Sequence, residues 1–280
     1  APVMLQLLTA QDAPRILVGD PAQGIYAFRG AMDAMAASGY PEVRLTQSFR
    51  FGPEIAAVAQ RALRIVAPGA KLRGAGTSGE VHFDRSITSG RRTILCRTTL
   101  GALEAMLEHG DVGVHLVGGI NDILRHLERA TTARREPPHD EARIGRRSGP
   151  GTPSHAAWDA FVAEADVTPG PLRVARRLAE RHGDDLPRLA SRIRTLQCDE
   201  REAQVTITTI HRSKGREWDD VVLWSDMREV ATTPGALARA TDVTDARGEV
   251  HLLYVALTRA RKRLDLTRLS PMLKQFLARG

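Results

Sequence analysis

The segment TITTIHRSKGREWDDVVL, residues 206–223, decides the expected fold because it places a polar loop between two strand candidates. The flanking runs at 205–210 and 221–224 are rich in β-branched and other apolar residues, as buried strands are. The loop has the pattern His-x-x-Lys-Gly-x-Glu, in which Lys214 and Glu217 offer a phosphate contact and a hydroxyl acceptor. A polar loop with an exposed ion pair is the alternative interpretation.

Strand and helix candidates alternate on both sides of this segment. Further strands are expected at 16–20, 43–47, 80–84, 93–97, 114–117 and 264–267. Helices are expected at 31–38, 53–66, 100–109, 158–196 (with starts near Pro171 and Pro187) and 249–261. This alternation predicts an α/β fold with a parallel sheet covered by helices.

The alternation stops near residue 130, where the composition changes. Residues 131–154 are rich in proline and charged side chains, which predicts a surface linker. Together with the helical pattern at 158–196, this linker predicts a mostly helical insertion into one α/β domain. The expected division of the chain is 1–40, 41–125, 126–200 and 201–280.

Composition limits the class of protein without deciding it. Hydrophobic residues make up 42%, enough for a sizeable core, and 40 Lys+Arg against 33 Asp+Glu give a net charge of +7. That excess favours a polyanionic partner. Cys96 and Cys198 show no metal-ligand spacing and indicate reduced thiols of a cytosolic protein; the expected compartment is the bacterial cytosol. No apolar run approaches the roughly 18 residues of a membrane span, so no membrane partner is expected.

Aromatic and arginine side chains gather in a segment at 19–31, GDPAQGIYAFRGA. Gln23 follows a predicted strand end, which is where α/β sheets bind ligands. Tyr26, Phe28 and Arg29 suit stacking on unpaired bases and pairing with phosphate. The alternative is an ordinary loop with two half-buried aromatic rings.

Two more arginine-containing segments flank the helix candidates. In LTQSFRFG, residues 45–52, Phe49 could stack on a nucleotide base and Arg50 could reach a phosphate. The alternative is a surface arginine beside a core phenylalanine. In LLYVALTRARKRL, residues 252–264, the two arginines Arg259 and Arg261 could equally form a solvated face.

Taken in order and spacing, the four segments resemble helicase motifs III, IV, V and VI of the UvrD/Rep class of superfamily 1A DNA helicases. The resemblance covers 16–59 and 205–266, with a weaker stretch, ILCRT, at 94–98. LTQSFRFG, and HLVGG at 115–119, look closer to the F-box DNA helicase branch. Where the family usually has Gly-Leu-Glu, this sequence has Gly-Arg-Glu at 215–217, so Arg216 departs from the family pattern and Glu217 keeps it.

The resemblance implies a RecA-like lobe of the P-loop NTPase type and a role for each matching residue. Phosphoryl-transfer residues would be Gln23, Arg50 and Arg259. ATP would be bound by Phe49 at the adenine and by Gly215 and Glu217 near the ribose. Single-stranded DNA would be contacted by Tyr26, Phe28, Arg29, Arg97, Thr98, His211 and Lys214.

Two motifs of the family are not found in the sequence. No G-x-x-x-x-G-K-[ST] loop occurs, and DEAR at 140–143 lacks the apolar strand of a Walker B segment. In the family, a stretch like APVMLQLLTAQ, residues 1–11, follows Walker B. Residues 1–40 are therefore expected to be a remnant of the first RecA-like lobe, and the Mg²⁺ ligands are expected in the missing N-terminal lobe.

The resulting expectation is part of an ATP-dependent 3′–5′ DNA helicase that acts on single-stranded DNA and duplex junctions, in repair or recombination. The isolated chain is expected to be inactive. One alternative is a degenerate helicase half that serves as a DNA-binding or assembly module. A helicase–nuclease subunit is the other, but no carboxylate/Lys nuclease cluster follows residue 264 in the sequence.

Overall fold

The computed structural model describes residues 3, 6–7, 10, 13–27, 30–31, 33–77, 79–135, 156–168 and 170–279. The predicted roles of Phe28 and Arg29, and the predicted linker beyond residue 135, lie outside these residues. The chain divides into two compact units, Ala1–Thr98 with Thr208–Gly280, and Thr99–Ile207.

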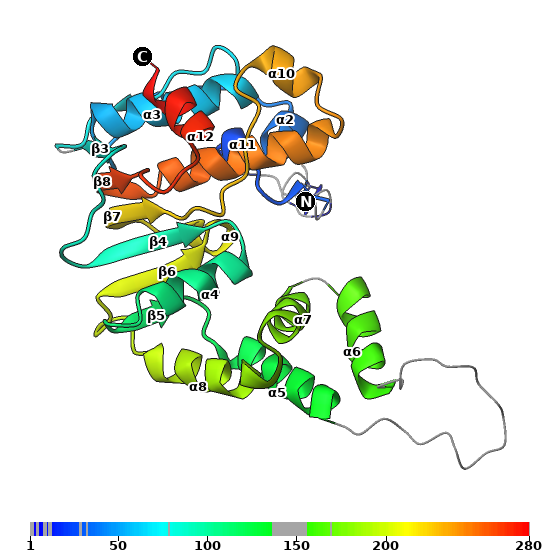
Figure 1. Ribbon diagram of the computed structural model, residues 1–280. Coiled ribbons are helices and arrows are strands. Elements are labelled where there is room, and N and C mark those ends of the chain that lie inside the picture. Colours follow the sequence, from blue (N-terminus) through cyan, green and yellow to red (C-terminus); the bar gives the residue numbers. More distant parts are fainter. Residues whose placement is uncertain are drawn as a thin grey trace. The chain divides into compact units, whose positions relative to one another are not determined.

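A six-stranded sheet has the strand order β3-β8-β7-β4-β6-β5 (Figure 1). Its strands are β3 (Glu80–His82), β4 (Arg92–Cys96), β5 (Val114–Leu116), β6 (Val205–Thr209), β7 (Trp218–Leu223) and β8 (Ala260–Asp265). The pairs β3–β8, β8–β7, β7–β4 and β6–β5 are parallel, with Val221 opposite both Thr93 and Leu264. The predicted α/β fold with a RecA-like parallel sheet is confirmed.

In the first unit, helices α3 (Pro53–Val66), α11 (Val243–Leu257) and α12 (Pro271–Ala278) lie side by side (Figure 1). They bury a core of Leu, Val, Ile and Ala with β7 and β8. α3 has the predicted bounds, with Pro53 in its first turn. The unit's short elements are η1 (Pro21–Gln23), α2 (Ala34–Ser38), β1 (Gln47–Ser48), β2 (Arg73–Gly74), α9 (Ile210–Ser213) and α10 (Pro234–Ala238).

The second unit is mostly helical. Its helices are α4 (Thr99–Glu108), α5 (Asn121–Arg135), α6 (Ala156–Val167), α7 (Pro171–His182), η4 (Gly183–Asp185) and α8 (Leu186–Leu196). α5 packs against α6, α7 and α8. The sequence analysis named no element at 121–130, and its prediction that 131–135 belong to a linker was wrong, because α5 continues to Arg135. The apolar positions of α5 have helical spacing and are buried: Ile123, Leu124, Leu127, Ala130 and Ala133.

Two predicted strands are absent or shorter in the structure. Residues 16–20 form no strand, and Ile16 and Val18 are 91% and 83% exposed. Of 43–47, only Gln47 is in a strand, in the pair of β1 with β2. A strand needs a hydrogen-bonding neighbour, and among the described residues none pairs with the run at 16–20.

The helix predicted at 249–261 begins earlier and ends earlier, as α11. Arg259 therefore lies in the turn after the helix, and Arg261 lies on β8. Within the described part of the chain, no helix combines the length and the hydropathy needed to cross a membrane.

Candidate functional site

Arg259 is a buried guanidinium at the turn between α11 and β8. The residue is 1% exposed, and its guanidinium donates hydrogen bonds to four oxygens at 3.1–3.2 Å. The acceptors are the carbonyl oxygens of Val255 and Arg216, the side-chain Oε1 of Gln23 and the hydroxyl oxygen of Thr258. All four acceptors are neutral. Burial, followed by the charge of Arg50, lowers the pKa of Arg259 to about 10. The group is thus charged at neutral pH.

Arg50 approaches the same turn from the loop before α3. Its Nε donates to Glu217 Oε2 at 2.5 Å, and its NH1 donates to the carbonyl oxygen of Thr258 at 2.9 Å. Thr258 therefore binds both arginines, one through its carbonyl and one through its hydroxyl. Two guanidiniums held together repel each other, and an anion placed between them would relieve that repulsion.

The short helix η1, which carries Gln23, is bound to α11 and to Lys214. Its Ala22 carbonyl accepts from His251 Nδ1 at 2.6 Å, and the Gln23 carbonyl accepts from Lys214 Nζ at 2.8 Å. Tyr254 donates its hydroxyl to Asp20 at 3.4 Å. Burial lowers the pKa of His251 and raises that of Tyr254.

Sequence reasoning did not single out His251 or Tyr254. Both are buried polar residues on α11, spaced three apart within an otherwise apolar run. That spacing puts them on one helix face, and it is the signal that could have found them.

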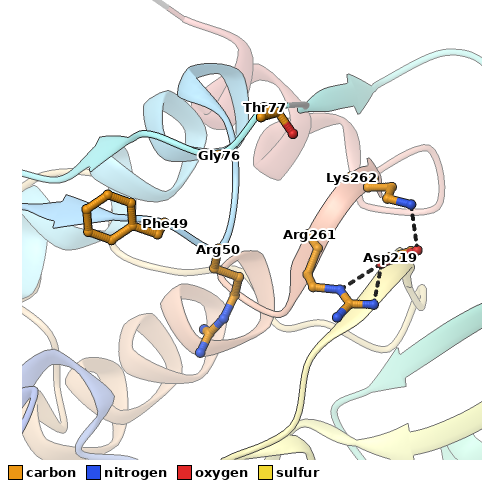
Figure 2. A pocket seen from close by; sticks show the side chains of 7 residues that line it. All are labelled: Phe49, Arg50, Gly76, Thr77, Asp219, Arg261 and Lys262. Atoms are coloured by element: carbon orange, nitrogen blue, oxygen red, sulfur yellow. Dashed lines mark hydrogen bonds and ion pairs between the residues drawn. The ribbon is translucent and has the colours of Figure 1, made fainter.

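A shallow open pocket of about 280 Å³ lies beside Arg50 (Figure 2). Phe49, with 79% of its surface exposed, is on one side, and Lys262 is on the other. Phe51, not Phe49, is the core phenylalanine, with 2% exposed. The exposed ring of Phe49 is therefore available for stacking.

Paired charges form the far wall of the pocket. Asp219 accepts from Lys262 at 2.9 Å and from Arg261 at 2.5 Å, and these two contacts, Lys262 first, lower the pKa of Asp219. Arg261 also lies 3.8 Å from Glu217 Oε1. Glu217 thus lies between Arg50 and Arg261.

Glycine is required where residues 73–77 pass the loop before α3. A Cβ atom on Gly74 would lie 2.1 Å from the carbonyl oxygen of Gly52, and one on Gly76 would lie 2.7 Å from the backbone of Phe51. This close approach places Thr77 in the pocket wall.

Tyr26, His211 and Lys214 come together near the end of β6. The Tyr26 hydroxyl donates to the His211 carbonyl at 2.9 Å, and the two ring centroids are 5.8 Å apart. Lys214 Nζ is 5.5 Å from the centroid of the Tyr26 ring. Gly215 has φ +86°, a left-handed conformation that glycine adopts without strain, and turns the chain toward β7.

Arg97 and Thr98, at the end of β4, are bound to acidic side chains. The Arg97 guanidinium makes a bidentate ion pair with Glu249, and this hydrogen bonding raises the pKa of Arg97. The Thr98 hydroxyl and backbone N–H both donate to Asp226 at 2.8 Å. The side chains of Arg97 and Glu249 are 18% and 6% exposed. In this structure the donors of both predicted DNA-binding residues are used within the protein.

The site does not fit a magnesium ion. Its carboxylates, Glu217 and Asp219, are paired with Arg50, Arg261 and Lys262, and the neighbouring groups are cations. Among the residues that the structure describes, no group of three or more His, Cys, Asp or Glu side chains is placed to hold a metal.

Residues 186–270 match the UvrD-like helicase C-terminal domain family. This range contains Lys214, Glu217 and Arg259, which form part of the site. The predicted resemblance to the C-terminal portion of UvrD/Rep-like helicases is confirmed.

Individual relatives point to the F-box branch and to UvrD2. F-box DNA helicase 1 of Gallus gallus is 29% identical over 291 residues, covering 93% of this chain and 27% of the relative. F-box DNA helicase protein 1 of Schizosaccharomyces pombe is 29% identical over 286 residues, covering 95% of this chain and 32% of the relative. ATP-dependent DNA helicase UvrD2 of Mycobacterium tuberculosis is 28% identical over 306 residues, covering 90% of this chain and 43% of the relative. The chain thus spans less than half the length of these relatives.

Proposed function

We propose that this chain forms the second RecA-like lobe of an ATP-dependent DNA helicase that moves 3′ to 5′ on single-stranded DNA and unwinds duplex at junctions. The observation that carries the proposal is the binding of Arg50 and Arg259 to the single residue Thr258. The relatives, F-box DNA helicases and an ATP-dependent DNA helicase, support it.

The two arginines suit the electrostatics of phosphoryl transfer. Negative charge spreads over the γ-phosphate oxygens as the bond breaks, and a positioned arginine stabilises it by about 10³–10⁵ in rate. Arg259 is buried and donates to four acceptors, and Arg50 is bound to Glu217. Both guanidiniums would therefore exchange present contacts for the phosphate when the lobes close. Gln23, bound to Arg259, would orient the attacking water.

The pocket beside Arg50 supports a role in binding the rest of the nucleotide. We propose that Phe49 stacks on the adenine, that Glu217 accepts a ribose hydroxyl, and that Gly215 allows the backbone to approach. Mg²⁺ would be held by carboxylates of the P-loop lobe, because this chain presents paired carboxylates and cations there.

Because the phosphates would be held by the other lobe, Arg50 and Arg259 would engage them only when the two lobes close. Nucleotide binding would thereby be coupled to lobe movement, and lobe movement to transport of the DNA strand. Tyr26, His211 and Lys214 offer an aromatic surface and a cation for that strand, and base stacking on such a surface is independent of sequence. Phe28 and Arg29 remain predicted contacts. A cytosolic location and a role in repair or recombination rest on the resemblance alone.

Phosphate release from ATP tests the proposal. The 280-residue chain with single-stranded DNA and Mg-ATP is expected to show no turnover. A fusion to a lobe with Walker A and B motifs is expected to hydrolyse ATP, and Arg259→Ala in that fusion should lower kcat by about 10³ or more. Robust turnover by the chain alone, or full activity of the Arg259→Ala fusion, would refute the assignment.

A further inference from the structure

Three hydrogen-bond donors at the end of β4 converge on one carboxylate. The backbone N–H of Arg97 donates to Asp226 Oδ1 at 2.8 Å. The backbone N–H and the hydroxyl of Thr98 both donate to Asp226 Oδ2, also at 2.8 Å. Asp226 follows β7, which pairs in parallel with β4, so the two strands bring the donors and the carboxylate to the same edge of the sheet.

The donor set suits an oxyanion. Backbone N–H groups and a hydroxyl are the groups with which proteins commonly bind phosphate oxygens of nucleic acids. α9, which carries His211, packs against β4. The three donors therefore follow a strand that packs against the helix carrying a proposed DNA contact.

The negative charges around the three donors would repel a phosphate as long as the Asp226 carboxylate stays in place. Arg97 is paired with Glu249, and Arg228 lies 3.4 Å from both Glu249 and Asp245. Two guanidiniums thus face three carboxylates, those of Asp226, Glu249 and Asp245. A phosphate would have to replace the Asp226 carboxylate rather than bind beside it.

We propose that Asp226 is an internal phosphate mimic that closes a phosphate site formed by Arg97 and Thr98. A backbone phosphate of single-stranded DNA binds this site when the Asp226 side chain rotates away. Asp226 is exposed enough to do so, since it is only half-buried and Thr98 is exposed. The inference rests on the proposed DNA binding and adds a residue that weakens it.

Fluorescence anisotropy of a labelled oligo-dT of about 20 nucleotides, titrated with the full chain at several salt concentrations, tests the inference. Asp226→Asn frees the Thr98 donors while its amide oxygen can still accept from Arg97. We expect affinity to rise about fivefold at low salt. The slope of log K against log salt should steepen by up to about 0.7, because Asp226 still closes the site in part of the wild-type complexes, and its removal lets a phosphate bind there in all of them.

The matched control is Asp245→Asn, which removes the same charge from the same cluster without touching the three donors. It should leave the slope unchanged. Adding Thr98→Ala to Asp226→Asn should cancel most of the gain. Equal effects of Asp226→Asn and Asp245→Asn, no effect of Asp226→Asn, or a loss of affinity with an unchanged melting temperature would each overturn the inference.

Two further variants keep the outcomes separate. Asp226→Ser removes the charge with a smaller side chain and carries the same expectation if Asp226→Asn does not fold. Lys214→Ala tests the proposed DNA contact itself. If Lys214→Ala weakens binding and the Asp226 variants change nothing, only this inference fails. If neither the wild type nor an Asp226 variant binds DNA, both proposals fail.

Discussion

Arg50 and Arg259 are hydrogen-bonded to the same residue, Thr258, at 2.9 Å and 3.2 Å. The three residues come from the loop before α3 and the turn after α11, two helices that pack against each other. Thr258 is therefore a structural link between two groups that are proposed to act on one phosphate.

Removing the Thr258 hydroxyl should destabilise the fold without displacing Arg50. Thr258→Val deletes an acceptor for Arg259 in a buried site, where an unsatisfied donor costs about 1–3 kcal/mol, while the carbonyl that Arg50 binds remains. Urea unfolding measures the loss. Thr258→Ser keeps the hydroxyl and serves as the control; a Val variant as stable as the Ser variant would contradict the prediction.

The buried charge of Arg259 predicts a pH dependence of stability. Because burial in the folded protein lowers this pKa to about 10, well below its value in the unfolded chain, the unfolded chain binds more protons above pH 10, and this residue's contribution to stability rises with pH there. Relative to Arg259→Gln, the wild type should gain about 1 kcal/mol between about pH 9 and pH 11. Parallel urea unfolding of both proteins checks this, since other titrating groups cancel. If the difference in unfolding free energy between the wild type and Arg259→Gln stays constant with pH, the pKa of Arg259 is not lowered by folding.

Phe49 and Phe51 should respond differently to truncation. Phe51→Ala removes a core ring and should lower the free energy of unfolding by about 3–5 kcal/mol. Phe49→Ala removes an exposed ring and should change the free energy of unfolding little. In the fusion with a P-loop lobe, Phe49→Ala should weaken ATP binding by about tenfold, if stacking on a base contributes about 1–3 kcal/mol. Unchanged nucleotide affinity of Phe49→Ala would remove Phe49 from the site.

Gly74 should not tolerate a side chain. In Gly74→Ala the new Cβ would meet the Gly52 carbonyl, and the shift this forces should cost about 1–3 kcal/mol. Gly248→Ala is the matched control, because this glycine lies in α11 and a Cβ atom added to it would meet nothing within 4 Å. It should stabilise the protein by about 0.5–1 kcal/mol. Thermal unfolding of the two variants should therefore shift in opposite directions.

The sequence alone determined the α/β class, the bounds of α3 and the order of the four motifs. Apolar periodicity reports which face of a local element is buried, and α3 has a strong pattern of this kind. The same reasoning placed a strand at 16–20, where the apolar pattern is present but no neighbouring strand is described. It also missed α5, because a charged composition hid its buried stripe.

Tertiary structure alone decided which groups meet. Arg50 and Thr258 are separated by 208 positions, and Asp226 is separated from Thr98 by 128. Contacts over such separations depend on the packing of α3 against α11 and on the register of β4 with β7, neither of which a local pattern encodes. For that reason the sequence could name Arg50, Arg259, Arg97 and Thr98, while only the folded chain could show that Thr258 joins the first two and that Asp226 binds the backbone of the last two.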